Sequence, residues 1–435
     1  MKNLLKRKIA LIAVLVFLVS FIFRLYKINE IPSVINSDTA DTLQTYLKFE
    51  TDNKNHLFEF NWNGSPAVNT YIIGLSWDLF GRSPFGYRLP AIFFSSLAVT
   101  SSFLIFYFLS KNLFFSFIIS LSLSANPVFF NFSREGWENI FNAFFINLLV
   151  IGFWLLFKKK RELYGTLFIA VGSILGFYSY HPGKIFLITS LIILSIYFIL
   201  NKSFKPLALT ILLFFLYVNP QIISIYKNNI KAFDRIKSVS ILSRNSPAYE
   251  ISKNFAKNIK AFIFLDSGSL QGVSYLNERY IPPNYSVVNK GLLLFYLTGI
   301  AIAIFNESYL FFIFLFTLFP VEIFSLDTPD ISRGIHILPV MYSFICLGIS
   351  EIHKLIKSRK IKKLYYLIIS TIVLIVFVFD LKIYYQWIGS ESTIKSREPF
   401  IRIKEFKSWS NMLENNLQND QGGFNVGEWN SRLAR

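Results

Sequence analysis

The amino-acid sequence predicts an all-α polytopic membrane protein with about eleven transmembrane helices and large loops on the extracytoplasmic side. Of its 435 residues, 53% are hydrophobic and only 16% are charged, whereas a soluble protein carries about a quarter charged residues. The hydrophobic residues form runs close to the roughly 20 helical residues that cross a bilayer core about 30 Å thick. This composition excludes disordered, collagen-like and disulfide-stapled secreted proteins, and the single cysteine, Cys346, forms no intrachain bridge.

The predicted spans are eleven apolar runs, at residues 9–26, 88–109, 113–132, 139–157, 163–179, 185–200, 206–225, 290–305, 308–325, 334–352 and 364–381. The first run follows a basic segment, as a signal peptide does. Because residues 21–26 are bulky and offer no small-residue cleavage site, we expect a retained membrane anchor.

The distribution of charge predicts the orientation of these spans. With the N-terminus inside, the inside loops are residues 1–8, 110–112, 158–162, 201–205, 306–307 and 353–363. These loops carry +15 of the formal net charge of +18. The basic excess is therefore a signal of membrane topology, and no nucleic-acid partner is needed to explain it.

The remaining polar segments then lie on the extracytoplasmic side. The largest are the loops 27–87 and 226–289, and shorter loops cover 133–138, 180–184 and 326–333. We expect one transmembrane domain over residues 1–381 and a short extracytoplasmic tail over 382–435. Large loops on one side, without an internal repeat, favour chemistry at that surface over a symmetric channel or transporter.

The first outer loop contains two carboxylates, Asp38 and Asp41, which lie three residues apart. In a helix both would share one face. A carboxylate in a partly desolvated cleft at the membrane surface is suited to deprotonating an acceptor hydroxyl. The alternative is helix capping by Ser37 and Asp38, and the spacing alone does not decide between the two.

Cations recur at the outer ends of several predicted spans, together with carboxylates and aromatic residues. Arg88 is suited to bind a phosphate, but taken alone it is equally suited to reach lipid headgroups. Arg134 is suited to a weak surface salt bridge. Their convergence on one membrane face nevertheless suggests an anionic lipid headgroup held near a carboxylate. The residues concerned are Arg88, Arg134, Glu135, Glu138, Tyr180, His181, Lys184 and Arg333.

Other chemistries find little support in the sequence. The four histidines show no metal-ligand spacing, and there is no Walker loop, GxGxxG or GxSxG motif. No cofactor is predicted. A divalent metal is conceivable at Asp38 and Asp41, but two carboxylates are too few ligands to predict one.

The order of the motifs resembles that of membrane-embedded GT-C glycosyltransferases, of the protein O-mannosyltransferase and lipid A aminoarabinose transferase type. The resemblance spans roughly residues 1–352. It rests on the segments Ser37–Asp41, Tyr71–Leu75, Leu79–Gly81, Tyr87–Pro90, Phe132–Glu135, Tyr178–Lys184 and Arg333–Pro339.

This resemblance implies an inverting transfer of a sugar from a polyprenyl-phosphate donor to a hydroxyl acceptor at the extracytoplasmic face. It assigns the general base to Asp38. It assigns donor-phosphate binding to Arg88, Arg134, Lys184 and Arg333, and substrate orientation to Glu135, Glu138, Tyr180 and His181. Many relatives have an Asp-Glu pair, whereas Thr39 follows Asp38 here and leaves Asp41 as the second acid.

Two other functions stay open at this point. The chain could be a transporter or flippase for a lipid-linked or anionic substrate, although its charged residues cluster at the outer ends of the spans. It could also be a non-catalytic assembly protein that keeps the GT-C fold. Under all three readings the protein is embedded in the membrane and contacts its lipids.

Overall fold

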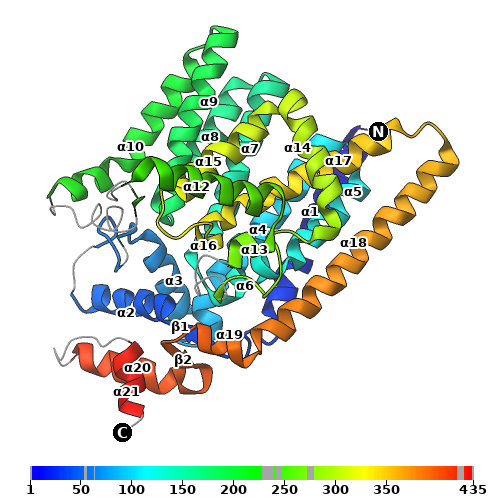
Figure 1. The fold of residues 1–435 in the computed structure, drawn as a ribbon. Coiled ribbons are helices and arrows are strands. Elements are labelled where there is room, and N and C mark those ends of the chain that lie inside the picture. The colour runs from blue at the N-terminus through cyan, green and yellow to red at the C-terminus, as the bar shows by residue number, and fades with distance from the viewer. Residues whose placement is uncertain are drawn as a thin grey trace.

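The computed structural model describes residues 2–52, 56–62, 64–227, 240–241, 246–271, 279–418 and 426–433. Over these residues the protein is almost entirely helical, with one sheet of two short strands (Figure 1). The prediction of an all-α polytopic membrane protein is confirmed. Within the loop 226–289, residues 228–239, 242–245 and 272–278 lie outside the described residues.

Each predicted apolar run forms a helix or a helix pair. These helices are α1 (Lys2–Leu25), α4 (Pro84–Ser110), α5 (Leu113–Ala125), α6 (Pro127–Glu135), α7 (Phe141–Lys159), α8 (Glu162–Tyr178), α9 (Ile185–Asn201), α10 (Lys205–Lys227), α14 (Leu293–Asn306), α15 (Ser308–Ile323), α17 (Leu338–Leu355) and α18 (Arg359–Ile388). By length and composition, the described residues contain seven helices able to cross a membrane, or nine when two bent pairs each count as one span.

The difference from eleven spans has local causes. The run 113–132 bends by 59° between α5 and α6, because Asn126 ends α5 and caps α6 while Pro127 occupies the first turn of α6. The helices α14 and α15 meet at 112° across Glu307. Helix α8 has only 17 residues, which is at the lower end of the roughly 17–25 residues of a membrane-spanning helix.

Small residues allow close packing of the helices. At Gly152 of α7, an added Cβ would lie 2.7 Å from the Ile169 side chain and 2.8 Å from the Gly165 carbonyl oxygen of α8. Glycine thus lets the two backbones approach, which is the usual device for helix contact inside a membrane. Helices α7 and α8 thereby form one rigid wall of the bundle.

The loops predicted to lie inside meet at one end of the bundle. Lys158 pairs with Glu307 at 3.2 Å, and Lys160 donates a hydrogen bond to Asn201 Oδ1 at 3.1 Å. These contacts join loops that lie far apart in sequence, as expected if all of them face the same compartment.

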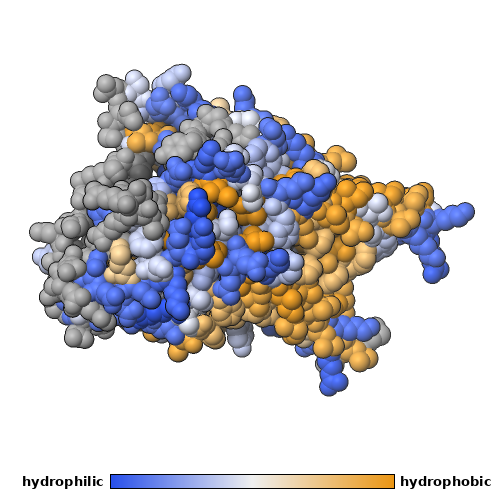
Figure 2. Space-filling view, turned by 90° about the horizontal axis from the view of Figure 1, so that it is seen from below, coloured by the Kyte–Doolittle hydropathy of each residue, from blue (hydrophilic) through white to orange (hydrophobic). Residues whose placement is uncertain are grey.

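The opposite end carries the polar elements. Helices α2 (Ser37–Thr51) and α3 (Val68–Leu79) follow the first span, and α20 (Phe406–Gln418) lies beside α2 (Figure 1). Strand β1 (Val34–Asn36) pairs antiparallel with β2 (Phe400–Arg402). Seen from below, hydrophilic residues cover much of the described part of this end, and hydrophobic surface extends away from it (Figure 2).

The segment 382–435, which the sequence predicts as a short extracytoplasmic tail, contains several helices and a strand. Helix α18 continues unbroken to Ile388, so a boundary at 381 would cut through it. Beyond it come α19 (Glu391–Ser396), β2, α20 and α21 (Val426–Leu433). Apolar side chains such as Trp409 are fully buried there, because this segment shares a core with the first outer loop.

Candidate active site

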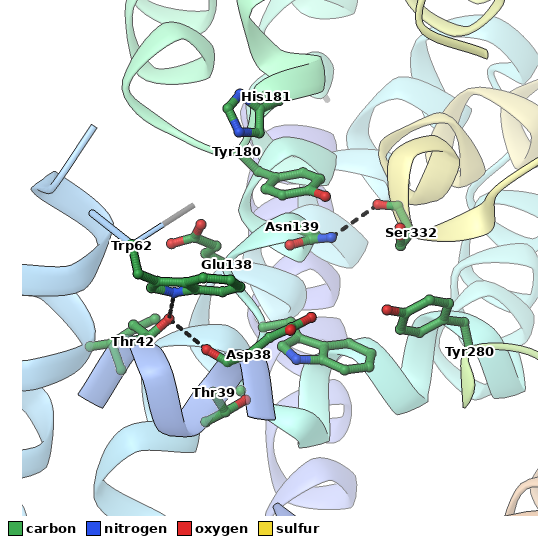
Figure 3. A pocket seen from close by; sticks show the side chains of 13 residues that line it. Asp38, Thr39, Thr42, Trp62, Glu138, Asn139, Tyr180, His181, Tyr280 and Ser332 are labelled. Carbon is green, nitrogen blue, oxygen red and sulfur yellow. Dashed lines mark hydrogen bonds between the residues drawn. The ribbon is translucent and has the colours of Figure 1, made fainter. Parts of the chain in front are cut away.

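A cavity of about 130 Å³ lies at the polar end of the molecule (Figure 3). Its walls come from seven separate stretches of the sequence, including all three short loops predicted to lie outside. The lining residues are Asp38, Thr39, Thr42, Trp62, Ile73, Gly136, Trp137, Glu138, Asn139, Tyr180, His181, Tyr280 and Ser332. Four predicted site residues are among them, namely Asp38, Glu138, Tyr180 and His181.

Asp38 lines this cavity from the first turn of α2. The cap of the helix is Asn36, whose side-chain oxygen accepts a hydrogen bond from the Thr39 backbone N–H at 2.9 Å. Capping by Asp38 is therefore not needed to begin the helix. Figure 3 shows its carboxylate reaching into the space below Tyr180, between Trp62 and Tyr280.

Asp41 does not line the cavity, although it lies one turn further along α2. Burial raises the pKa of its carboxyl from the ordinary value to about 6. The neighbouring Asp38 charge raises the pKa further, whereas Lys48 lowers it. Asp41 is thus placed to influence the electrostatics of Asp38 rather than to touch a molecule in the cavity.

Aromatic side chains form much of the cavity wall. The Trp62 indole donates a hydrogen bond to Thr42 Oγ1 at 3.1 Å, and Thr42 donates to the Asp38 carbonyl at 2.9 Å. The rings of Trp137 and Tyr280 lie 4.9 Å apart. Such rings offer flat apolar faces with polar edges, which suits a molecule that is itself a ring bearing hydroxyl groups.

Sequence reasoning missed several of these residues. Thr42 lies four residues after Asp38, so helical spacing could have indicated it. Trp62 and Tyr280 carried no signal, because each comes from a long polar loop whose folding no local pattern fixes. The sequence predicts Asn139 only as the first residue of the span 139–157. In the structure its amide donates to the Ser332 carbonyl at 3.0 Å and links two loops.

A second cavity, of about 420 Å³, adjoins the first. Tyr180 and His181 line both cavities. The remaining lining residues are mostly apolar, with two cations among them: Pro182, Lys184, Ile185, Ile188, Ser240, Pro320, Val321, Phe324, Ser325 and Arg333. The two predicted phosphate-binding cations nearest the first cavity thus share this second space.

The two cations of the second cavity are held differently. Arg333 donates to the Asp327 carbonyl at 2.7 Å and lies 3.5 Å from the Asp330 carboxylate. The Lys184 ammonium contacts Nδ1 of His181 at 3.2 Å. Because an ammonium can only donate, this ring nitrogen must accept and carries no proton. The Lys184 charge therefore faces a neutral partner.

Arg88 and Arg134 lie outside both cavities and are fully buried. Arg88 donates to the carbonyls of Ile28 and Pro32, at 2.6 and 3.1 Å. Arg134 donates to the carbonyls of Arg24 and Ile31, both at 2.8 Å. Both guanidinium groups thus hold the chain between α1 and β1, and we leave them out of the phosphate site proposed below.

Glu135 also lies outside the cavities, although it immediately precedes Gly136. Its carboxylate is buried and forms an ion pair with Arg397 from the C-terminal segment. Its other oxygen lies 3.4 Å from the side-chain nitrogen of Asn36. Glu135 therefore contacts the helix cap behind the cavity instead of the cavity itself.

The described residues contain no group of three or more His, Cys, Asp or Glu side chains that could hold a metal ion. Asp38 and Asp41 do not face one shared space, since only Asp38 lines the cavity.

No family model matches the chain, and no curated protein matches it in sequence. Among solved structures, it is similar to ArnT from Cupriavidus metallidurans in the apo state, with a TM-score of 0.49 and 9% identity. It is also similar to the same protein bound to undecaprenyl phosphate, with a TM-score of 0.46 and 10% identity. Both comparisons cover 91% of this chain and 77% of the other. ArnT is a lipid A aminoarabinose transferase.

Proposed function

We propose that this protein is a membrane glycosyltransferase that moves a sugar from a polyprenyl-phosphate donor to a hydroxyl group of an acceptor. The observation that carries the proposal is the junction of the two cavities. One contains the carboxylates of Asp38 and Glu138, the other contains two cations among apolar side chains, and Tyr180 and His181 border both. A polyprenyl-phosphate sugar has matching parts in the same order: a sugar with hydroxyl groups, a negatively charged phosphate and an apolar lipid chain.

The larger cavity suits the lipid and phosphate parts of the donor. Its apolar lining from α9 and α15, such as Ile188 and Val321, would contact the polyprenyl chain. Lys184 and Arg333 would bind the phosphate by charge-assisted hydrogen bonds. The absence of a glycine-rich phosphate loop from the sequence fits recognition by side-chain cations.

The smaller cavity suits the sugar and the acceptor hydroxyl. The hydroxyl oxygen attacks the anomeric carbon and forms the new C–O bond, while the bond from that carbon to the phosphate oxygen breaks. Asp38 takes the hydroxyl proton. The departing lipid phosphate gains negative charge, which Lys184 and Arg333 stabilise. A single displacement from the face opposite the phosphate inverts the anomeric centre.

Tyr180 stands between the two reacting parts. Burial raises the pKa of its hydroxyl to about 12, although the Arg333 charge acts in the opposite direction. The phenol is therefore protonated at neutral pH and can donate a hydrogen bond to the sugar or the phosphate. Glu138, which is also buried, would accept hydrogen bonds from sugar hydroxyls.

The distribution of charge supports an extracytoplasmic active site. The loops that carry +15 meet at one end of the bundle, and both cavities lie toward the other end. Lysine- and arginine-rich loops usually stay in the cytoplasm. The donor and the acceptor would then meet at the outer surface of the membrane.

The test is sugar transfer by the purified chain in nanodiscs, supplied with polyprenyl-phosphate sugars and candidate hydroxyl acceptors. We expect Asp38→Asn to abolish transfer while the variant still binds polyprenyl phosphate. Glu50→Gln, on the same helix but outside both cavities, is the matched control and should keep its activity. Normal turnover by Asp38→Asn would contradict the proposal, and movement of lipid-linked sugar without a new glycosidic bond would indicate a transporter.

A further inference from the structure

We infer that Arg397 is a positioning residue that fixes Asp38 through Glu135 and Asn36. The inference rests on the proposed function and deepens it, because it assigns a role to the C-terminal segment. Arg397 lies just after α19, is 1% exposed, and touches neither cavity. It therefore acts through its neighbours and not on a substrate.

The guanidinium of Arg397 reaches three separate parts of the chain. It pairs with the Glu135 carboxylate, lies 3.4 Å from Asn131 Oδ1, and donates to the Arg279 carbonyl at 3.3 Å. Arginine can do this because its planar group carries five donors in a fixed geometry. A lysine at this position would offer a single ammonium group.

The first connection runs from Glu135 to the start of α2. The Asn36 amide nitrogen donates to Glu135 at 3.4 Å, so its oxygen points the other way. That oxygen accepts from the Thr39 backbone N–H at 2.9 Å and from the Trp137 indole at 3.1 Å. Glu135 thus fixes which end of the Asn36 amide caps the helix, and Asp38 lies in that first turn.

The second connection reaches the opposite wall of the smaller cavity. The Arg279 guanidinium donates to the carbonyls of Ser396 and Arg397 at 2.9 and 3.1 Å, while Arg397 donates back to the Arg279 carbonyl. The next residue, Tyr280, lines the cavity. Through these contacts the buried Arg397 guanidinium fixes the positions of Asp38, Trp137 and Tyr280 relative to one another.

The strand pairing strengthens the same link. In the two-stranded sheet, Asn36 lies opposite Phe400, three residues after Arg397. The C-terminal segment therefore contacts the residue that caps α2 both through the sheet and through Glu135. These contacts are the reason to give the segment a positioning role rather than that of a passive cover.

A single replacement of Arg397 or Glu135 would leave a buried charge without its partner and could prevent folding. We therefore choose the double variant Glu135→Leu/Arg397→Met, which removes both charges but also removes the group that orients Asn36. The matched control is Glu414→Gln. It breaks the 2.9 Å pair with Arg82, which ties the same C-terminal segment to the loop between α3 and α4.

Three quantities are measured for each protein in nanodiscs: kcat and KM for sugar transfer, the Kd for polyprenyl phosphate, and amide hydrogen exchange. For the double variant we expect kcat to fall by about 10- to 100-fold, because small misplacements of a catalytic group have effects of that order. The Kd should stay unchanged, since Lys184 and Arg333 lie on another wall. Exchange should accelerate in peptides that cover residues 36–42.

A double variant with the kcat and the exchange of the unmodified protein would overturn the inference. If the unmodified protein transfers no sugar, the proposed function fails, and hydrogen exchange alone then decides whether Arg397 and Glu135 hold the start of α2. Faster exchange throughout the double variant, with a lower melting temperature, would show a general structural role and would also contradict a positioning one. Glu414→Gln should change none of the three quantities.

Discussion

The Lys184 ammonium lies 3.2 Å from Nδ1 of His181, where the two cavities meet. Because His181 accepts this hydrogen bond, the cation is oriented without being neutralised. A phosphate that enters the larger cavity can then take the place of the histidine and gain the full charge of Lys184. This relationship makes Lys184 the most direct probe of the proposed donor site.

We expect Lys184→Met to weaken binding of polyprenyl phosphate by about 10- to 100-fold, since a hydrogen bond to a charged group contributes about 1.5–3 kcal/mol. Microscale thermophoresis in nanodiscs would measure the Kd. Lys202→Met, at the other end of α9, changes the same residue type in a predicted inside loop and serves as the control. Equal Kd values for both variants would place the phosphate elsewhere.

Arg88→Met should affect stability and not donor binding. The buried guanidinium donates to the carbonyls of Ile28 and Pro32, and removing it leaves both acceptors unsatisfied, at about 1–3 kcal/mol each. We expect a lower melting temperature in detergent, with an unchanged Kd for polyprenyl phosphate in the folded fraction. A weakened Kd with unchanged melting would instead return Arg88 to the phosphate site.

Gly136→Ala should be markedly destabilising. Gly136 has φ of +84°, and an added Cβ would lie 2.9 Å from the Tyr87 ring. Gly81 has nearly the same φ, +85°, but its Cβ would meet nothing within 4 Å. Gly81→Ala should therefore cost only the backbone strain of about 1–2 kcal/mol, and Gly136→Ala more. Equal losses in thermal melting would mean that Tyr87 moves aside freely.

Asp41 should make stability fall with rising pH in a defined window. Its folded-state pKa is raised to about 6, mainly by burial, so between the ordinary value and about 6 the folded protein holds a proton that the unfolded chain has lost. Stability contributed by that proton is lost as the pH rises through 6. Asp41→Asn should abolish this dependence and be more stable at pH 8, by about 1 kcal/mol after allowance for solvent screening.

Melting temperatures of both proteins between pH 4 and pH 8 would test this effect. A wild-type protein that gains stability as the pH rises from 4 to 6, relative to Asp41→Asn, would contradict it. Asp266 provides an internal comparison, because hydrogen bonds with Ser269 lower the pKa of its carboxyl. Its contribution therefore has the opposite sign and appears at lower pH.

Trp62 should contribute to binding at the smaller cavity through its ring. Trp62→Ala removes both the aromatic surface and the hydrogen bond to Thr42, whereas Trp62→Phe keeps a ring. Aromatic contacts contribute about 0.5–1.5 kcal/mol, so the alanine variant should raise KM for the acceptor or the donor by about 2- to 10-fold. An equal rise in both variants would assign the effect to the lost hydrogen bond.

Much of the architecture follows from local sequence. Apolar runs must form helices in a bilayer because no water is there to satisfy the backbone, and each run that the sequence predicts is indeed helical. The length of an apolar run does not reveal where a helix breaks inside it. The break at Asn126-Pro127 comes from the cap and the proline at that point, and α8 has only 17 residues.

The candidate site, too, could be predicted only in part from the sequence. From the charges and the loop positions, the sequence predicts that Asp38, Glu138, Lys184 and Arg333 lie at one end of the molecule. In the structure they line the two adjoining cavities. The spacing of Asp38 and Asp41 could not show that only Asp38 faces the cavity. That depends on the direction in which α2 lies, which is set by the Asn36 cap and its contacts.

The sequence by itself determined the apolar helices, the charge signal for their orientation and the position of the polar loops between them, since these depend on local composition. The tertiary structure decided which of the predicted cations line a cavity. Arg88 and Arg134 look the same as Lys184 in sequence, yet they are buried against backbone carbonyls. It also brought the C-terminal segment against Glu135, because the pairing of Arg397 with Glu135 joins residues 262 positions apart. No local pattern encodes a contact of that range.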